Sequence, residues 1–273
     1  MTKPRDLANS VNASSIPTAR LQDDAVTNAK LAFDGGPLSG FRNLLINGNP
    51  IVNQREYVSG TNTSGANEYT LDRWRVVTSG QNITFSTTAG ICTVTAPAGG
   101  VEQVVEGASI LGGSYVLSWT GTATATIGGN AVTNGGTVSL TGGSNATVRF
   151  TGGTFSKAQL EPGTVATAFE HRPLQVELAL CQRYYWQSAT STNHFGLQGY
   201  NTAGNNISQT VLFPVEMRVA PTVTFGAQST TNTTGLSANA VYKGGYLLIA
   251  AATATGFTAA TLNASFVKHD AEL

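Results

Sequence analysis

Charged residues are scarce in this sequence. Only 11% of its 273 residues are charged, 15 basic and 15 acidic, against about 25% in a typical globular protein. The formal net charge is zero, so the chain has no overall field with which to attract phosphate groups or anionic lipid headgroups. We therefore expect neither nucleic acid nor a charged membrane surface as the main partner.

Cysteines are few, and long apolar runs are missing. Cys92 and Cys181 are too few for a disulfide framework, and neither has His or Cys near it at the spacing of zinc ligands. No apolar run approaches the roughly 18 residues of a membrane span. The polar start from Met1 to Asn9 does not resemble a signal peptide. We expect two buried thiols and no membrane insertion.

The sequence lacks the strong catalytic motifs. It contains no GxSxG, HExxH, P-loop or GxGxxG pattern. The three histidines, His171, His194 and His269, are far apart in the sequence. We therefore expect no cofactor, no metal site and no catalytic residue of these kinds.

Acidic residues need separate treatment, because glycoside hydrolysis requires only two carboxylates about 5 to 10 Å apart. Glu102 and Glu106 are four residues apart in a strand-like run, or about 13 Å, which is too far. We interpret Asp72 as an ion-pair partner of the neighbouring arginines and Glu161 as a turn residue. Together they do not predict an enzyme.

The first 41 residues differ from the rest. They contain a short helical pattern through Leu21, Val26 and Leu31, followed by Gly35, Gly36, Pro37 and Gly40, which break the chain. A helix of about ten residues is marginal in water on its own. We therefore interpret residues 1–41 as a tether whose helix, over 23–31, is ordered by a neighbouring chain or a docking partner.

From Asn43 onward the pattern is that of an all-β fold. Gly-Gly pairs separate short segments that alternate or are rich in β-branched residues. In the segment 114–120, Tyr115, Leu117 and Trp119 fall on one face, as a period of two requires. We predict that Trp119, like Trp74 in another alternating segment, belongs to the core.

A short helix is predicted between two β regions. Leu174, Leu178 and Cys181 are at helical spacing directly after Pro173, which predicts a helix over 174–183. This divides the chain into a β-sandwich domain at 42–173 and a second β-sandwich domain at 174–273.

The strands contain long stretches without charge. No charged residue occurs from Gly107 to Val148, and only Lys243 is charged between Val219 and Val267. Edge strands normally carry charge, which prevents them from pairing with other chains. Its absence predicts that the edges are covered, and a symmetric oligomer would cover them.

Aromatic residues near predicted loop tips are candidates for sugar contact, because ring faces pack against the C–H surfaces of neutral sugars and polar side chains supply hydrogen bonds. Part of the set lies in residues 188–206, which form either an adaptable binding loop or only a solvated one. The candidates are Tyr200, Asn201, Tyr242, Tyr246, His194 and Phe195.

Several strings in the sequence resemble blocks of bacteriophage tail-fibre and host-adhesion proteins. They are NLLINGNPIVNQRE (43–56), YTLDRWRV (69–76), KAQLEPGTVATAFEHRP (157–173), ELALCQRYYW (177–186) and VLFPVEMRVAPTVTF (211–225). The string SIPTARLQDDAVTNAKL (15–31) is similar to a linker motif near the start of such fibres. The run through LEPG and FEHRP into ELALCQRYY is the most specific part.

The resemblance implies a homotrimeric virion protein. Its first β domain would be a jelly-roll module, its N-terminal segment would attach to phage tail or baseplate proteins, and its C-terminal domain would bind a bacterial surface polysaccharide or lipopolysaccharide. The protein would be made in the host cytoplasm and act at the host cell surface. Two alternatives remain at this point, a purely structural tail component and a polysaccharide depolymerase.

Overall fold

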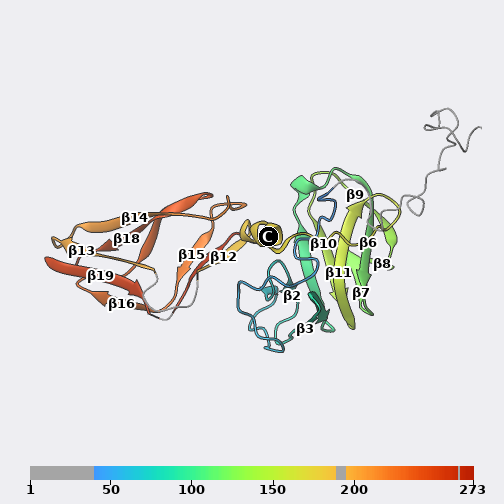
Figure 1. The fold of residues 1–273 in the computed structure, drawn as a ribbon, viewed down its shortest axis with the longest axis horizontal. Helices are drawn as coiled ribbons and strands as arrows, with labels where there is room; N and C mark the ends of the chain where they lie inside the picture. The colour runs from blue at the N-terminus through green and yellow to red at the C-terminus, as the bar shows by residue number, and fades with distance from the viewer. Residues whose placement is uncertain (1–39, 189–194, 264) are drawn as a thin grey trace, which may run out of the picture.

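The described part of the chain is mostly antiparallel β-sheet, with one α-helix. A computed structural model describes residues 40–188, 195–263 and 265–273 (Figure 1). The strands form five sheets, two in residues 68–162, the first β region, and three in residues 185–270, the second β region. The all-β prediction is confirmed. Leu21, Val26 and Leu31 lie outside the described residues, so the tether remains a prediction.

The first β region is a sandwich of two sheets. The six-stranded sheet has the order β1 (Glu68–Tyr69), β2 (Arg75–Val76), β5 (Val101–Val105), β10 (Ala146–Thr151), β7 (Thr124–Ile127) and β8 (Asn130–Val132). The five-stranded sheet has the order β3 (Thr84–Thr88), β4 (Ile91–Thr95), β11 (Thr154–Pro162), β6 (Gly113–Thr120) and β9 (Gly136–Leu140). A short 3₁₀ turn, η2 (Gly107–Ser109), follows β5.

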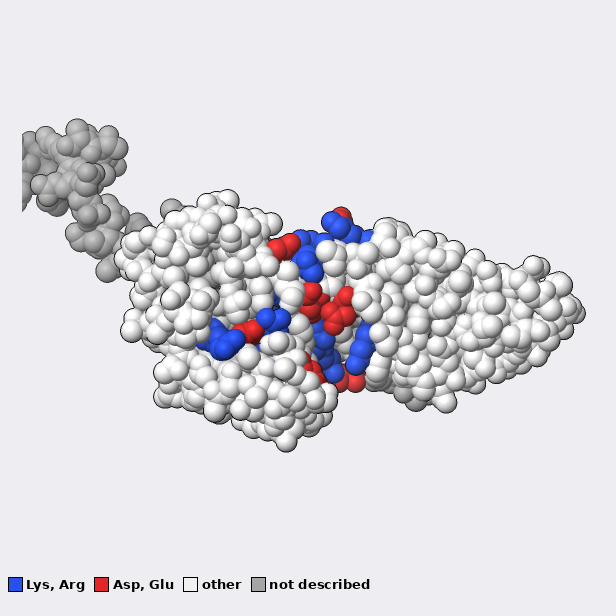
Figure 2. Space-filling view, turned by 180° about the vertical axis from the view of Figure 1, so that it is seen from behind, with Lys and Arg blue, Asp and Glu red and all other residues white. Residues whose placement is uncertain are grey.

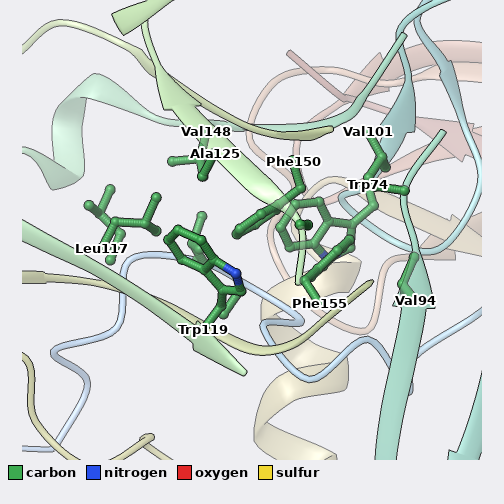
Figure 3. Close-up of a cluster of buried hydrophobic side chains, with 14 of the residues drawn as sticks. Trp74, Val94, Val101, Leu117, Trp119, Ala125, Val148, Phe150 and Phe155 are labelled. Atoms are coloured by element: carbon green, nitrogen blue, oxygen red, sulfur yellow. The ribbon is translucent and has the colours of Figure 1, made fainter. Parts of the chain in front are cut away.

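Aromatic side chains fill the space between these sheets (Figure 3). Phe150 and Phe155 stack with ring centroids 4.4 Å apart. Trp74 packs on Phe155 at 5.0 Å and Trp119 meets Phe150 edge-on at 5.3 Å. Both tryptophans are buried, which confirms their predicted place in the core. Rings bury large apolar areas, so this cluster is a main source of the sandwich's stability.

The string at residues 43–52 has a structural explanation. The Asn47 amide donates to the main-chain oxygens of Val52 at 2.9 Å and Asp72 at 3.0 Å, and so satisfies buried groups of an irregular segment. Next to it, a Cβ atom at Gly48 would lie 2.3 Å from the carbonyl oxygen of Ala158. Glycine is therefore required where this segment crosses β11.

Helix α2 (Leu174–Gln182) links the two β regions and confirms the predicted helix. Pro173 precedes its first residue, where the missing N–H costs nothing. Its buried residues are Glu177 and Cys181, whereas Leu174 is exposed. Cys92 and Cys181 are both buried free thiols, and burial raises the pKa of each.

The second β region distributes its strands over three sheets of three. They are β12 (Tyr185–Gln187), β20 (Val267–Asp270) and β15 (Thr222–Phe225); β13 (Gly196–Asn201), β19 (Gly256–Leu262) and β16 (Gln228–Thr231); and β14 (Asn206–Leu212), β18 (Gly245–Ala251) and β17 (Ser237–Tyr242). Alternate residues of these strands point into one shared core, which includes Leu197, Leu248 and Leu262.

The last residues of the chain lie between the two β regions (Figure 1). Strand β20 runs back toward α2, and the main-chain N–H of Ala271 bonds to the oxygen of Tyr184, just after that helix. The end of the molecule farthest from the first β region is therefore formed by connections between strands. We call the loops 202–205, 232–236 and 252–255 the distal end.

Candidate functional site

Charged side chains gather in a band between the two β regions (Figure 2). We call this band the waist. In the same view the far part of the second β region shows no charged side chain. The waist comprises Arg55, Arg73, Arg75, Glu102, Glu106, Arg183, Arg218, Asp270 and Glu272.

Arg73 of the first β region and Arg55 of the segment before it hold Glu272 at the waist. Arg73 is 1% exposed and pairs with Glu272, and Arg55 reaches the same carboxylate at 3.0 Å. Burial is the largest single influence on Arg73 and would lower its pKa, but the Glu272 carboxylate together with Tyr184 and Tyr69 outweighs burial and raises that pKa. The guanidinium carbons of Arg73 and Arg55 lie 3.6 Å from the ring centres of Tyr184 and Tyr185 respectively.

Main-chain atoms at the end of the chain are also bound there. Arg218 donates to the oxygen of Glu272 at 2.8 Å. The oxygen of Leu273 accepts from the Tyr69 hydroxyl at 3.0 Å and from Arg75 at 2.9 Å. These contacts join the second β region to the first, so the waist acts as a joint between them.

The distal end is uncharged and held together by main-chain hydrogen bonds. Gly204 donates to the oxygen of Ala252, Ala252 to that of Asn205, and Thr253 to that of Asn232, each at 2.9 Å. All three loops consist of Thr, Ala, Gly, Asn and Leu. The distal end therefore offers hydroxyls, amides and small apolar groups to a ligand, and no ionic group.

An exposed aromatic pair lies next to the distal end. Tyr200 on β13 is directly opposite Phe257 on β19, and the two are 80% and 55% exposed. The Cβ atoms of directly opposite residues are about 4.5–5.5 Å apart, so both rings project from one sheet face.

The predicted candidates Tyr242 and Tyr246 do not join this pair. Tyr242 is 50% exposed, but it lies at the opposite end of the second β region. The adjacent turn contacts the segment before the waist, with Met217 donating to the oxygen of Lys243 at 2.9 Å. Tyr242 therefore does not lie at the distal end with Tyr200, so the two candidates do not form one site.

The prediction that Tyr246 contacts a ligand is wrong. Gly245 begins strand β18, so Tyr246 follows the strand alternation inward and is 0% exposed. Its ring packs near Phe213 and His269, and its hydroxyl lies 3.4 Å from Nε2 of His269. Burial raises the pKa of Tyr246.

The remaining candidates have different surroundings. Asn201 is partly buried, and its side-chain oxygen accepts from the N–H of Thr202 at 3.0 Å, which shapes the loop after Tyr200. Phe195 is partly buried and packs against the core of the second β region, so its ring contributes to the fold. His194 lies outside the described residues.

The acidic residues of the first β region are engaged in structural contacts. Glu161 lies in β11, not in a turn as we predicted, and pairs with Arg42 at 2.7 Å. Glu102 is shared by two arginines at 2.7 Å each. Asp72 is not the ion-pair partner of Arg73 that we expected, but accepts from the main-chain N–H and the amide of Gln54 at 2.5 and 2.8 Å.

The described residues contain neither a metal-binding cluster nor a membrane-spanning helix. No three His, Cys, Asp or Glu side chains there are grouped as a metal site would need. Within the same residues, no helix is both long enough and apolar enough to span a bilayer. No protein-family model, curated protein or solved structure matches the chain.

Sequence reasoning missed Phe257, the partner of Tyr200. The residues before it, Ala254, Thr255 and Gly256, indicate a turn, and an aromatic residue directly after a turn was the available signal. The pairing itself joins residues 57 positions apart and depends on strand register.

Proposed function

We propose that this protein is a short bacteriophage tail fibre that binds a glycan on the bacterial surface through its distal end. The N-terminal segment attaches the fibre to the tail or baseplate. The first β region positions the second, and the second meets the host. The action is binding without turnover, at the surface of the host cell.

The observation that carries this proposal is the contrast between the two ends of the second β region. The waist holds the charged residues and fixes this region to the first one, while the distal end presents an exposed ring pair among uncharged polar groups. Exposed rings flanked by hydroxyls and amides suit a sugar ligand.

A homotrimer fits the same role. Linking identical weak sites raises avidity through effective concentration, without any new contact. Three sites of millimolar affinity could therefore hold a particle on a cell. The long stretches without charge in both β regions, residues 107–148 and, apart from Lys243, the residues between Val219 and Val267, support this part of the proposal.

Binding to bacteria tests the proposal. Fluorescently labelled protein is incubated with a panel of bacterial strains, and bound protein is measured by flow cytometry. We expect binding to at least one strain and a loss of about tenfold or more in Tyr200→Ala, the size of effect that central interface aromatics show. The melting temperature should not change, because Tyr200 is 80% exposed.

Tyr242→Ala is the matched control, because Tyr242 is an exposed tyrosine of the same β region near the waist. It should bind cells like the unmodified protein. Equal losses in the two variants would argue against a distal site. A protein that binds no strain, with its distal end covered by another protein in the particle, would favour a purely structural tail component. Release of reducing ends from host polysaccharide would favour a depolymerase.

A further inference from the structure

The face around Tyr200 and Phe257 is a platform with one aromatic row and one polar row. The polar row is the neighbouring row on the same sheet face. It consists of Gln198 on β13, Ala259 on β19 and Thr231 on β16, which lie opposite one another. Gln198 and Thr231 are exposed, and Ala259 between them adds only a methyl group. Two ring faces therefore lie beside an amide and a hydroxyl.

Among the described residues, the charged side chains of the second β region lie away from this platform. The charged residues of the second β region are Glu216, Arg218, Lys243, Lys268 and Asp270. Lys243 precedes β18 at its waist end, and the seven residues of that strand span about 20 Å. The Debye length is about 8 Å at physiological ionic strength. The field of Lys243 is therefore largely screened at the distal end.

An acidic sugar would find no partner for its carboxylate here. Removing a charged group from water without pairing it is costly, and the platform has no cation to offset that cost. An uncharged sugar fits, because its C–H faces can pack on Tyr200 and Phe257 while its hydroxyls bond to Gln198 and Thr231.

A second copy of the chain is the alternative occupant, and the structure favours a different surface for it. The outer face of β18 carries Leu247, Ile249 and Ala251 in one continuous apolar row, and its residues are only partly buried. The platform instead interrupts its apolar groups with Gln198 and Thr231.

We infer that the platform around Tyr200 and Phe257 selects uncharged saccharides and that its affinity is independent of ionic strength. This inference rests on the proposed function and specifies the ligand class of the same site. Specificity comes from the absence of cations as much as from the rings, because acidic glycans are rejected by the cost of desolvation.

Binding of the whole chain to immobilised glycans tests this inference. The neutral probes are maltoheptaose, cellohexaose, chitohexaose and dextran. The acidic probes are polygalacturonate, hyaluronate and polysialic acid. Each is measured at 20 mM and 500 mM NaCl. We expect at least one neutral probe to bind with less than about a twofold change between the salts, because the site makes no ionic contact.

Phe257→Ala should weaken that binding about tenfold or more, while Tyr242→Ala leaves it unchanged. Preferred binding of an acidic probe, or a tenfold loss in high salt, would overturn the inference. So would a fall in oligomeric mass in Phe257→Ala, which would identify the platform as a contact between copies.

Cell binding separates failure of this inference from failure of the proposed function. If the protein binds cells but no neutral probe binds or competes, the ligand class is wrong and the proposed function stands. If it binds no cells and no probe, both fail.

Discussion

His269 is an imidazole held among rings in the interior of the second β region. It is 0% exposed and stacks on Trp186 with ring centres 4.4 Å apart. Nδ1 lies 3.1 Å from the main-chain oxygen of Trp186, and Nε2 lies 3.4 Å from the Tyr246 hydroxyl. No carboxylate is among these partners, so the site suits only the neutral imidazole. Burial lowers the pKa of His269 to about 4, partly opposed by the Trp186 oxygen.

Acid should therefore weaken the fold through this residue. Between the ordinary histidine pKa of about 6.5 and the folded value of about 4, the unfolded chain binds a proton that the folded chain does not. The stabilisation that comes from the neutral His269 is fully present above pH 6.5 and is lost as the pH falls to about 4. The free energy of unfolding should fall by about 3 kcal/mol over this range. Urea denaturation at several pH values measures it.

His269→Gln is the comparison, because glutamine keeps donor and acceptor groups and does not titrate. The variant should be less stable at neutral pH, since it lacks the stacked ring, but its stability should depend less on pH between 6.5 and 4. Identical pH dependence of stability in the two proteins would show that His269 is not the cause of the loss of stability in acid.

The positions of helices and strands were easier to predict than the face of a strand on which each side chain lies. Pro173 and the spacing up to Cys181 predicted α2, and the alternation of Tyr115, Leu117 and Trp119 predicted an inward face that is buried. Tyr246 was misplaced because the Gly-Gly pair before it was interpreted as a loop throughout, whereas Gly245 begins the strand. A shift of one residue in a strand reverses the face.

The pairing across the platform could not be predicted for a related reason. Local alternation gives the inward and outward sets of one strand, but the strand opposite Tyr200 is fixed by packing of the whole second core. For the same reason the sequence did not indicate that residues 271–273 lie at the waist, since their partners Tyr69 and Arg75 are about 200 positions earlier.

Strand β20 and the residues after it form the joint between the regions, and Glu272 is its central contact. Glu272→Gln keeps the shape of the side chain but leaves Arg73, which is 1% exposed, without its counter-charge. Breaking a buried pair in this way costs about 3–5 kcal/mol. We expect a loss of that size in the free energy of unfolding, measured in urea.

Asp270→Asn is the control for the joint. Asp270 pairs with Arg55 at 3.7 Å, and its side chain is 44% exposed, so solvent screens the pair and its loss should cost less than about 1 kcal/mol. If Glu272→Gln were no more harmful than Asp270→Asn, the waist would not be a buried ionic joint.

In the molecule as a whole, the second β region keeps its charged side chains apart from its outer apolar surface. Ion pairs are concentrated at the waist, and the far part of the second β region shows no charged side chain in this view (Figure 2). A face of an antiparallel sheet that meets water is ordinarily polar. The central strand β18 instead points Leu247, Ile249 and Ala251 outward, between edge strands β14 and β17. A surface of this kind is expected at contacts between copies.

The proposed homotrimer, if it is built on this face, predicts an oligomeric mass three times the chain mass of 28.3 kDa. Ile249→Glu places a carboxylate in the middle of the apolar row, where association would have to desolvate it without a cation nearby. We expect light scattering to show this variant as single chains. A measurable urea unfolding midpoint should show that the dissociated chain is still folded. Thr261→Glu puts the same charge on the outer face of central strand β19 and should keep the trimer mass. A single-chain mass for the unmodified protein, or dissociation of Thr261→Glu alone, would contradict an assembly built on β18.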